Sequence, residues 1–134
     1  MSLKIRVITP DKIVLNTSSN AIVLPSTSGQ LGILTDHAPL ITALEVGVLR
    51  FKAENDWSPI ILLGGFAEVE DNEVTILVNG VEDVSTIDLA AAKSELDTAS
   101  SALLNAETSK EKIEASQKVK KASARVQAAA FVKN

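Results

Sequence analysis

The chain has 134 residues, 46% of them hydrophobic and 22% charged, with a formal net charge of −4, which is typical of a folded globular domain and excludes an intrinsically disordered chain. It contains no cysteine, so disulfides, thiolate metal ligands and thiol redox chemistry are excluded. No apolar run approaches the length that spans a bilayer, and Lys4 and Arg6 interrupt the apolar residues at the N-terminus, so we expect neither a membrane span nor a signal peptide.

Residues 3–85 have the pattern of short β-strands. Apolar and polar residues alternate in short runs, which end at turn residues such as Thr9-Pro10-Asp11. The runs that predict strands are 3–8, 12–16, 21–24, 40–44, 46–52, 57–63, 66–70 and 73–78. Asp71-Asn72 gives the last two runs a two-residue hairpin turn. Some nine or ten strands with no helix between them indicate an all-β sandwich or barrel with an aliphatic core.

The stretch 28–39 is the most unusual part of this region. It contains two glycines three residues apart, Gly29 and Gly32, together with Pro39 and the only histidine of the chain, His37. Because glycine and proline both constrain the backbone, this density of special residues predicts a shaped loop between two strands.

From Ile87 onward the hydrophobic period changes from that of strands to that of helices. Asp88 is the predicted N-cap of a first helix, and Thr108 with Glu111 has capping-box spacing at the start of a second. Two helices of about seventeen to twenty residues with a short connection make an antiparallel hairpin. Apolar residues recur every three or four positions, first at Leu89, Ala92, Leu96, Ala99, Leu103 and Ala106 and then at Ala115, Val119, Ala122, Val126 and Ala129.

These patterns predict an α+β protein with two domains. Residues 1–86 would form an all-β sandwich of about ten strands, and residues 87–134 a C-terminal antiparallel two-helix hairpin. At least half of the hairpin seam is alanine, whose methyl group contributes roughly 0.8 kcal/mol on burial, against roughly 1.5 to 3 kcal/mol for a buried leucine or valine. We therefore expect a helical element that can detach and re-dock without unfolding the sandwich.

No group of residues in the sequence indicates catalysis or metal binding. Asp36-His37 is near Ser26 and Ser28 in the chain, but without a nucleophile-elbow signature, so a histidine that packs, hydrogen-bonds in its loop or lies at a subunit contact is favoured. One histidine and no cysteine cannot make a zinc site, and the acidic residues lack the spacing of a calcium loop. Gly29-x-x-Gly32 and Gly64-Gly65 lack the Lys and Ser/Thr of a phosphate loop, so we expect close backbone packing at both.

Charge is divided unevenly along the chain. Residues 1–86 have five basic and eleven acidic side chains (net −6), whereas residues 87–134 have eight and six (net +2). No acidic residue follows Glu114, and the basic residues after it include Lys118, Lys120, Lys121 and Arg125. These cations form either a solvated face that complements the helix dipole or a docking face for an acidic surface on a partner protein. The basic excess is small and lacks interleaved aromatic residues, so nucleic acid is not an expected partner.

Three stretches of the sequence are distinctive in wording, order and spacing. They are LPSTSGQLGILTDHAP at 24–39, GGFAEV at 64–69 and EVTILVN at 73–79. With these stretches in a β-rich domain followed by an alanine-rich helix pair, the chain resembles the epsilon subunit of the F-type ATP synthase over nearly its whole length. The wording is most similar to that of the cyanobacterial and plastid members.

The resemblance implies a non-catalytic rotor subunit with no cofactor of its own, peripheral on the thylakoid membrane at its stromal or cyanobacterial cytoplasmic side. In that family the sandwich binds the gamma subunit and the polar loops of the membrane c-ring, so that gamma turns with the ring. The helix hairpin either folds against the sandwich or extends along gamma toward the catalytic head of alpha and beta subunits. When it is extended, its basic second helix meets an acidic segment of beta and blocks ATP hydrolysis.

The resemblance also implies roles for individual residues. It places Ser28, Gly29, Gln30 and Leu31 in a loop that faces the c-ring, His37 and Thr42 toward gamma, and Lys118, Lys120, Lys121 and Arg125 on the inhibitory basic helix. Some bacterial members bind ATP through Ile/Leu-Asp-x-x-Arg-Ala at the start of the first helix. In this chain Ala91 takes the place of that arginine and Lys121 that of a later one, so direct ATP sensing is not implied.

Two other functions stay open from the residues alone. A free-standing small-molecule-binding module would use the crevice between sandwich and hairpin, and a ligand would then raise the melting temperature. A hydrolase would use His37, and its turnover would be lost in His37→Ala.

Overall fold

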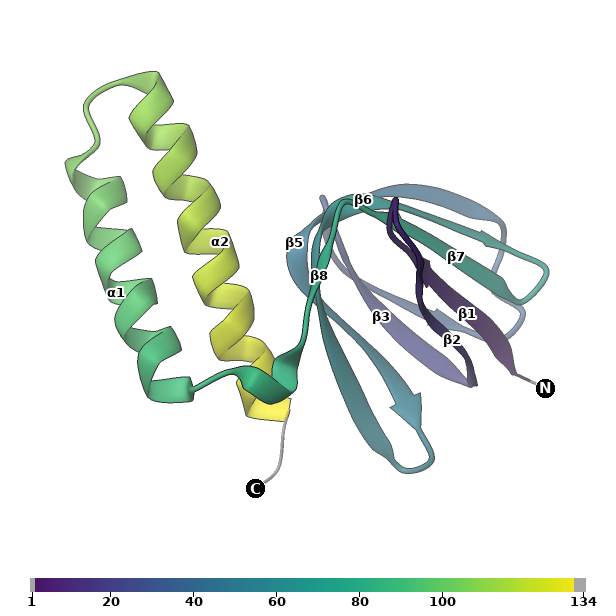
Figure 1. Cartoon of the computed structure of the whole chain (residues 1–134). Helices are drawn as coiled ribbons and strands as arrows, with labels where there is room; N and C mark the ends of the chain where they lie inside the picture. Colours follow the sequence, from purple (N-terminus) through teal and green to yellow (C-terminus); the bar gives the residue numbers. More distant parts are fainter. Residues whose placement is uncertain (1, 132–134) are drawn as a thin grey trace.

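The computed structural model describes residues 2–131, which form a β-sandwich followed by an antiparallel pair of helices (Figure 1). Residues 132–134, the end of the predicted helical domain, lie outside the described residues. Neither long helix, over the residues described, combines the length and apolar character that crossing a membrane needs. The elements are β1 (Leu3–Ile8), β2 (Ile13–Ser19), β3 (Ala21–Ser26), β4 (Gly29–Leu34), β5 (Leu40–Ala53), β6 (Asp56–Glu70), β7 (Glu73–Val78), β8 (Val81–Glu82), the 3-10 helix η1 (Val84–Thr86), α1 (Leu89–Asn105) and α2 (Ser109–Phe131).

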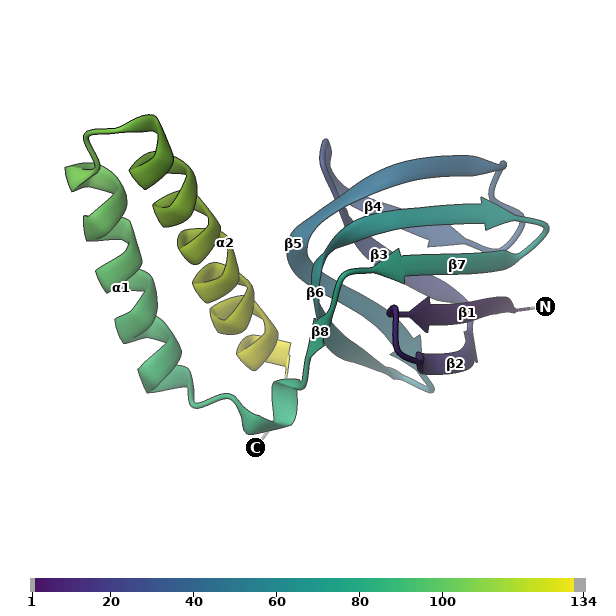
Figure 2. The ribbon, with the colours of Figure 1, turned by 45° about the horizontal axis from the view of Figure 1, so that its top comes forward.

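The strands form one continuous hydrogen-bonded sheet in the order β2-β1-β7-β6-β5-β3-β4, with β8 paired to β6. β1 and β7 run parallel, and the other neighbours run antiparallel. The long pair β5 and β6 curves through the whole sandwich (Figure 2). One end of this pair adjoins β7, β1 and β2, which we call the first layer, and the other end adjoins β3, β4 and β8, the second layer.

The predicted sandwich is confirmed, but it has eight strands where about ten were expected. The predicted breaks at residue 45 and at Gly64-Gly65 fall inside β5 and β6, whose pairing continues on both sides from Leu40↔Val69 to Ala53↔Asp56. The two glycines have φ values of +87° and +155°, so they bend β6 without ending it. The runs predicted at 40–44 and 46–52 are thus the two halves of β5, and those at 57–63 and 66–70 the two halves of β6, whereas β4 and β8 match none of the predicted runs.

The prediction of a loop over 28–39 is wrong for half of that stretch. β4 occupies Gly29–Leu34, and a two-residue turn joins it to β3, because Ser26 pairs with Gly29. Strand formation is favoured because Ile33 is fully buried and pairs with Ile22 of β3, while Gly29 and Gly32 interrupt the apolar alternation that would have shown this in the sequence. Only residues 35–39 connect β4 to β5 as a loop.

The core between the two layers is aliphatic, as predicted. Its fully buried side chains are inward-facing residues of the strands, and Phe51 is the one aromatic member among the described residues. The Asp71-Asn72 turn is also confirmed, because Glu70 pairs with Glu73 and both turn residues have positive φ (51° and 62°), as a type I′ hairpin requires. The core cluster is Leu3, Ile5, Val7, Ile22, Leu24, Ile33, Leu44, Leu49, Phe51, Leu62, Ala67, Val69, Val74, Ile76 and Val78.

Both predicted helix starts are confirmed. The Asp88 side chain accepts the Ala90 amide hydrogen at 3.0 Å and caps α1. At the start of α2, Thr108 Oγ1 accepts the Glu111 amide at 3.1 Å, and the Glu111 carboxylate accepts the Glu107 amide at 3.1 Å. The helices have 17 and 23 residues and run antiparallel.

The second helix lies between the first helix and the sandwich in both views (Figures 1 and 2). Ala92 and Ala99 of α1 and Ala115 and Ala122 of α2 are buried at seven-residue spacing, which confirms the alanine seam between the helices. A second pair of alanines, Ala124 and Ala128, packs on Val48 of β5, Ile61 of β6 and Val84 of η1. The sequence did not predict this second face, because its two alanines lie between the members of the seam repeat.

Candidate interaction surfaces

The turn between β3 and β4 is an exposed end of the second layer. Thr27 donates its amide to the Ala43 carbonyl at 3.1 Å, and Ser26 Oγ donates to the Gly29 carbonyl at 2.5 Å. Of the four residues predicted to face the c-ring, Ser28, Gly29 and Gln30 are exposed, whereas Leu31 packs against the core. This turn therefore presents three small or polar residues on a rigid hairpin, not on a loop.

The loop 35–39 is held by the turn between β6 and β7. Asn72 Oδ1 accepts the Asp36 amide hydrogen at 2.6 Å, and Asn72 Nδ2 donates to Asp36 Oδ1 at 3.2 Å. The His37 ring donates from Nδ1 to the Ala38 carbonyl at 2.7 Å, so it hydrogen-bonds within its own loop, as the sequence favoured. Ser26 and Ser28 contact each other at 3.3 Å, and no serine hydroxyl is paired with His37 among the described hydrogen bonds.

His37 and Thr42, the two residues predicted to face gamma, are both half-buried. Thr42 pairs with the buried Ala67, so its side chain lies on the inner face of the sheet, and its Oγ1 donates to the Ala43 carbonyl at 3.3 Å. A partner that binds here would therefore contact the loop 35–39 and only the exposed parts of His37 and Thr42.

An apolar row crosses the outer face of the first layer, on five paired strands. Phe66 and Leu77, directly paired, are 60% and 52% exposed, and Ile13 is 57% exposed. Direct strand pairing puts the five members on the same face, since paired residues point the same way. The outer row is Ala43, Phe66, Leu77, Ile8 and Ile13. The sequence alone does not predict this row, although Phe66 and Leu77 occupy strand positions where neighbours such as Glu68 and Thr75 are polar.

Close backbone packing explains only some of the glycines. A Cβ added at Gly65 would lie 2.0 Å from the Leu77 carbonyl oxygen and 2.8 Å from Val78 Cα, which confirms the expectation for that residue. At Gly29 and Gly32 the expectation is wrong, because no atom of the described chain lies within 4 Å of the added Cβ. Gly29 instead has a φ of +120°, which side chains rarely adopt.

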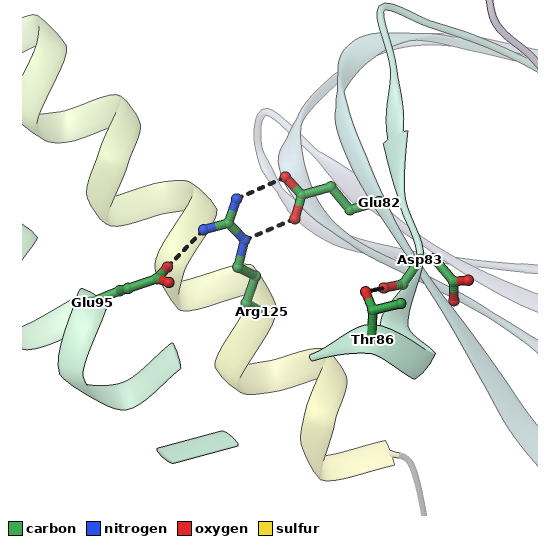
Figure 3. A network of polar contacts seen from close by, with 5 residues as sticks. All are labelled: Glu82, Asp83, Thr86, Glu95 and Arg125. Carbon is green, nitrogen blue, oxygen red and sulfur yellow. Dashed lines mark hydrogen bonds and ion pairs between the residues drawn. The ribbon is translucent and has the colours of Figure 1, made fainter. Parts of the chain in front are cut away.

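Figure 3 shows Arg125 of α2 between two carboxylates from other elements. Its Nε and Nη2 donate to the two carboxylate oxygens of Glu82, at the end of β8, at 2.8 and 2.9 Å. Its Nη1 donates to Glu95 of α1 at 2.7 Å. The contact with Glu82 is bidentate, the geometry in which arginine binds carboxylate most strongly. One side chain thus bonds the sandwich, the first helix and the second helix together.

The network shifts the pKa values of its members. The hydrogen bonds from Arg125 lower the pKa of Glu82 below its ordinary 4.5; burial opposes this, and the charges of Arg125 and Lys121 add to it. The hydrogen bonds to Glu82 raise the pKa of Arg125 further. Both groups are therefore ionised over the neutral range, and the contact is a true ion pair.

The connection between sandwich and hairpin is capped at both ends. Asp83 accepts the Ser85 amide at 2.9 Å and its hydroxyl at 2.8 Å, which lowers the pKa of Asp83 and fixes the start of η1. Thr86 Oγ1 donates to the Asp83 carbonyl at 3.0 Å, as Figure 3 also shows. Asp88 then caps α1. Residues 83–88 are consequently a short, ordered joint.

The four basic residues predicted to act together do not share one face in this structure. Lys118, Lys121 and Arg125 line a cleft of about 470 Å³ between the two helices. Lys120 points the other way and lies 3.6 Å from Glu45 of β5. The side chains of this second pair are 39% and 41% exposed, so it contributes little to docking.

A second cleft of about 450 Å³ contains Ala91, the residue in place of an ATP-binding arginine. Four carboxylates line it, from Glu82, Asp83, Asp88 and Glu95, against the single guanidinium of Arg125, which both Glu82 and Glu95 already engage. This excess of negative charge disfavours a polyphosphate ligand. Across residues 2–131, no three His, Asp or Glu side chains are grouped as a metal site would need.

Comparisons with known proteins match both parts of the chain. The model of the ATP synthase delta/epsilon chain beta-sandwich domain matches residues 2–84, and that of the long alpha-helix domain matches residues 85–130. The chain is 58% identical to the chloroplastic ATP synthase epsilon chain of Pyropia yezoensis, over 96% of each chain. It is 53% identical to the ATP synthase epsilon chain of Thermosynechococcus vestitus, over 98% of each.

Two solved structures share the fold. One chain of the OSCP/F1/c-ring part of the Euglena gracilis mitochondrial ATP synthase superposes with a TM-score of 0.82 and 20% identity, over 98% of this chain and 82% of that one. One chain of the central stalk and c-ring of the Tetrahymena thermophila mitochondrial ATP synthase gives 0.67 and 20%, over 96% and 97%. At this identity the likeness shows a common architecture of sandwich and helices.

Proposed function

Because the chain belongs to the ATP synthase delta/epsilon family, as an epsilon chain and not a catalytic subunit, we propose that it joins the gamma subunit to the c-ring in the rotor of a proton-translocating ATP synthase. The observation that supports this most directly is the match of both domains to the family at high identity and over nearly the full length. The chloroplastic and cyanobacterial names of the relatives support a peripheral position on the thylakoid membrane, at its stromal or cyanobacterial cytoplasmic side.

Two separate surfaces of residues 1–86 suit two partners. The exposed turn residues Ser28, Gly29 and Gln30 precede or begin β4, whereas His37 follows its end. A strand of six residues spans about 20 Å, so these surfaces lie well apart. The turn faces the polar loops of the c-ring. The loop 35–39 and the outer row face gamma, because an exposed apolar surface of this kind marks a protein contact. Thr42, whose side chain lies on the inner face, meets gamma only at its edge beside this loop.

Residues 87–134 are the regulatory part in this proposal. The apolar docking contact of the hairpin consists of two alanine methyl groups and the partly buried Phe131, a small surface that a competing partner can replace. When it extends toward the alpha and beta subunits, Lys118, Lys120, Lys121 and Arg125 bind an acidic surface of beta and slow ATP hydrolysis. Extension frees Lys120 and Arg125 from their present carboxylate partners.

Binding and inhibition are tested by separate experiments. Tagged chain mixed with a gamma subunit and c-ring from a plastid or cyanobacterial synthase should copurify with both. Full-length chain added to a catalytic portion that lacks its epsilon should lower ATPase activity, and a chain ending after Val84 should bind gamma but leave ATPase unchanged. Equal ATPase activity with both forms would exclude the inhibitory role, and no copurification with gamma would exclude the rotor role.

A further inference from the structure

Arg125 provides every described side-chain hydrogen bond between the helices and the sandwich. Both of these bonds go to Glu82, and the third bond of the guanidinium goes to Glu95 of the other helix. The remaining contacts are the alanine face on Val48, Ile61 and Val84, Phe131 at the end of α2, and the exposed Lys120–Glu45 pair. The Phe131 ring packs on that apolar cluster and lies 5.0 Å from the Arg50 guanidinium of the sandwich. The polar part of docking is thus concentrated in one arginine.

Arg125 is surrounded by carboxylates in the docked hairpin, and the proposed inhibitory contact would also place it against carboxylates, those of another subunit. In the docked hairpin, all three nitrogens of its guanidinium donate to carboxylate oxygens, two on the sandwich and one on α1. An acidic surface of another subunit could bind the same guanidinium only after those bonds break, because one fork binds one carboxylate bidentately. Internal and external carboxylates must therefore compete.

We propose that Glu82, supported by Glu95, is an internal competitor for Arg125 that holds the hairpin docked and keeps it from inhibiting. The proposal rests on the inhibitory role of the hairpin stated above and adds its control. Releasing Arg125 from Glu82 both frees the hairpin and exposes the cation that an acidic partner binds. The two consequences can be separated, because docking is measured in the isolated chain and inhibition only in the complex.

Docking is measured from the distance between two spin labels. The chain has no native cysteine, so Asn16→Cys on exposed β2 and Leu104→Cys near the end of α1 give two unique labelling sites. Glu82→Gln keeps the shape of the side chain and removes its charge. We expect it to raise the extended fraction at least threefold, whereas Glu54→Gln, an equal charge change on an exposed turn, should leave the distance distribution unchanged.

Inhibition of ATPase gives the second readout. Glu82→Gln should inhibit at a severalfold lower concentration than the native chain, and Arg125→Gln should extend the hairpin but inhibit more weakly. The exchanged pair Glu82→Arg with Arg125→Glu should dock more than either single variant, although the new carboxylate faces Glu95, and should leave inhibition weak, because the helix then lacks one of its four proposed inhibitory cations. Glu82→Gln and Arg125→Gln should thus both extend the hairpin, while the first strengthens inhibition and the second weakens it. Only competition for Arg125 predicts this combination.

An unchanged distance distribution in Glu82→Gln would overturn the proposal whatever the ATPase result. Weaker inhibition by Glu82→Gln than by the native chain would overturn it too, since a competitor's removal must strengthen inhibition. If the labels move apart but neither native nor variant chain inhibits, the inhibitory role fails, and the Glu82 contact is retained as a docking contact alone.

Discussion

Arg125 and Glu82, 43 residues apart in the chain, form a two-bond ion pair that connects the last long helix to the last strand of the sandwich. Both side chains are partly buried, at 31% and 26% exposure, so the pair is less screened than the Lys120–Glu45 pair nearby. We therefore expect the docking of the hairpin to weaken when Glu82 loses its charge.

Acid should release the hairpin. The pKa of Glu82 is lowered in the docked state and returns to 4.5 when the hairpin extends, so the contact stabilises docking above pH 4.5 and is lost as pH falls through the lowered value. Label distances should be constant between about pH 7 and pH 5 and lengthen below. Glu95 on α1 and Lys121 on α2 also face Arg125 or Glu82, so the Glu82→Gln variant serves as control. An equally steep acid transition in that variant would contradict the assignment to Glu82.

Steric change at the docking face should release the hairpin without altering charge. Ala128 is fully buried against the sandwich, and Ala128→Leu adds three carbons where no space exists. Overpacking costs about 1 to 3 kcal/mol, which shifts the docking equilibrium roughly 5- to 150-fold toward the extended form. Gln127→Leu, on the exposed side of the same helix, is the matched control. Unchanged label distances in Ala128→Leu would show that this alanine face does not determine docking.

Replacement by alanine should destabilise the sandwich strongly at one glycine and hardly at all at another. Gly65→Ala should lower the free energy of unfolding by about 3 kcal/mol or more, because its Cβ would overlap the Leu77 carbonyl and its φ is +155°. Gly32→Ala meets no neighbouring atom of the described chain, so its effect should stay within about 0.5 kcal/mol. Urea unfolding of both variants provides the comparison. A small loss at residue 65 would mean that β6 and β7 separate easily there.

Charge placed in the outer row should weaken gamma binding. Phe66→Glu introduces a carboxylate into the row beside Leu77, which a gamma contact would have to desolvate, so the dissociation constant should rise at least about tenfold. Asn55→Glu places the same carboxylate on the exposed turn between β5 and β6, outside the outer row, and should leave gamma binding unaltered. Equal affinities for both variants would remove the outer row from the proposed interface.

The fold was largely predictable from sequence because its signals are local. The alternation of apolar and polar residues predicted most of the strands, and Asp71-Asn72 predicted a hairpin turn. Asp88 and Thr108 predicted the two helix starts. β4 was missed because Gly29 and Gly32 interrupt the alternation of a strand whose burial depends on β3. The continuity of β6 was not predicted, because a glycine that bends a strand and a glycine that ends one look the same in the sequence.

The candidate surfaces were less predictable because they depend on neighbours distant in sequence. The basic residues of α2 were identified, but no local pattern shows that Arg125 meets Glu82 or that Lys120 points away from Lys121. The outer row becomes visible only when strand pairing places Phe66 beside Leu77 and Ile8 beside Ile13. Long-range pairing and the burial it produces decide both cases.

The most direct test of the rotor role is proton-driven ATP synthesis. Membranes that hold a plastid or cyanobacterial synthase stripped of its epsilon should regain ATP synthesis when the chain is added, in proportion to the amount bound. The chain ending after Val84 should restore synthesis as well, because coupling is assigned to residues 1–86. Binding of the full-length chain to these membranes with no gain in ATP synthesis would contradict the account.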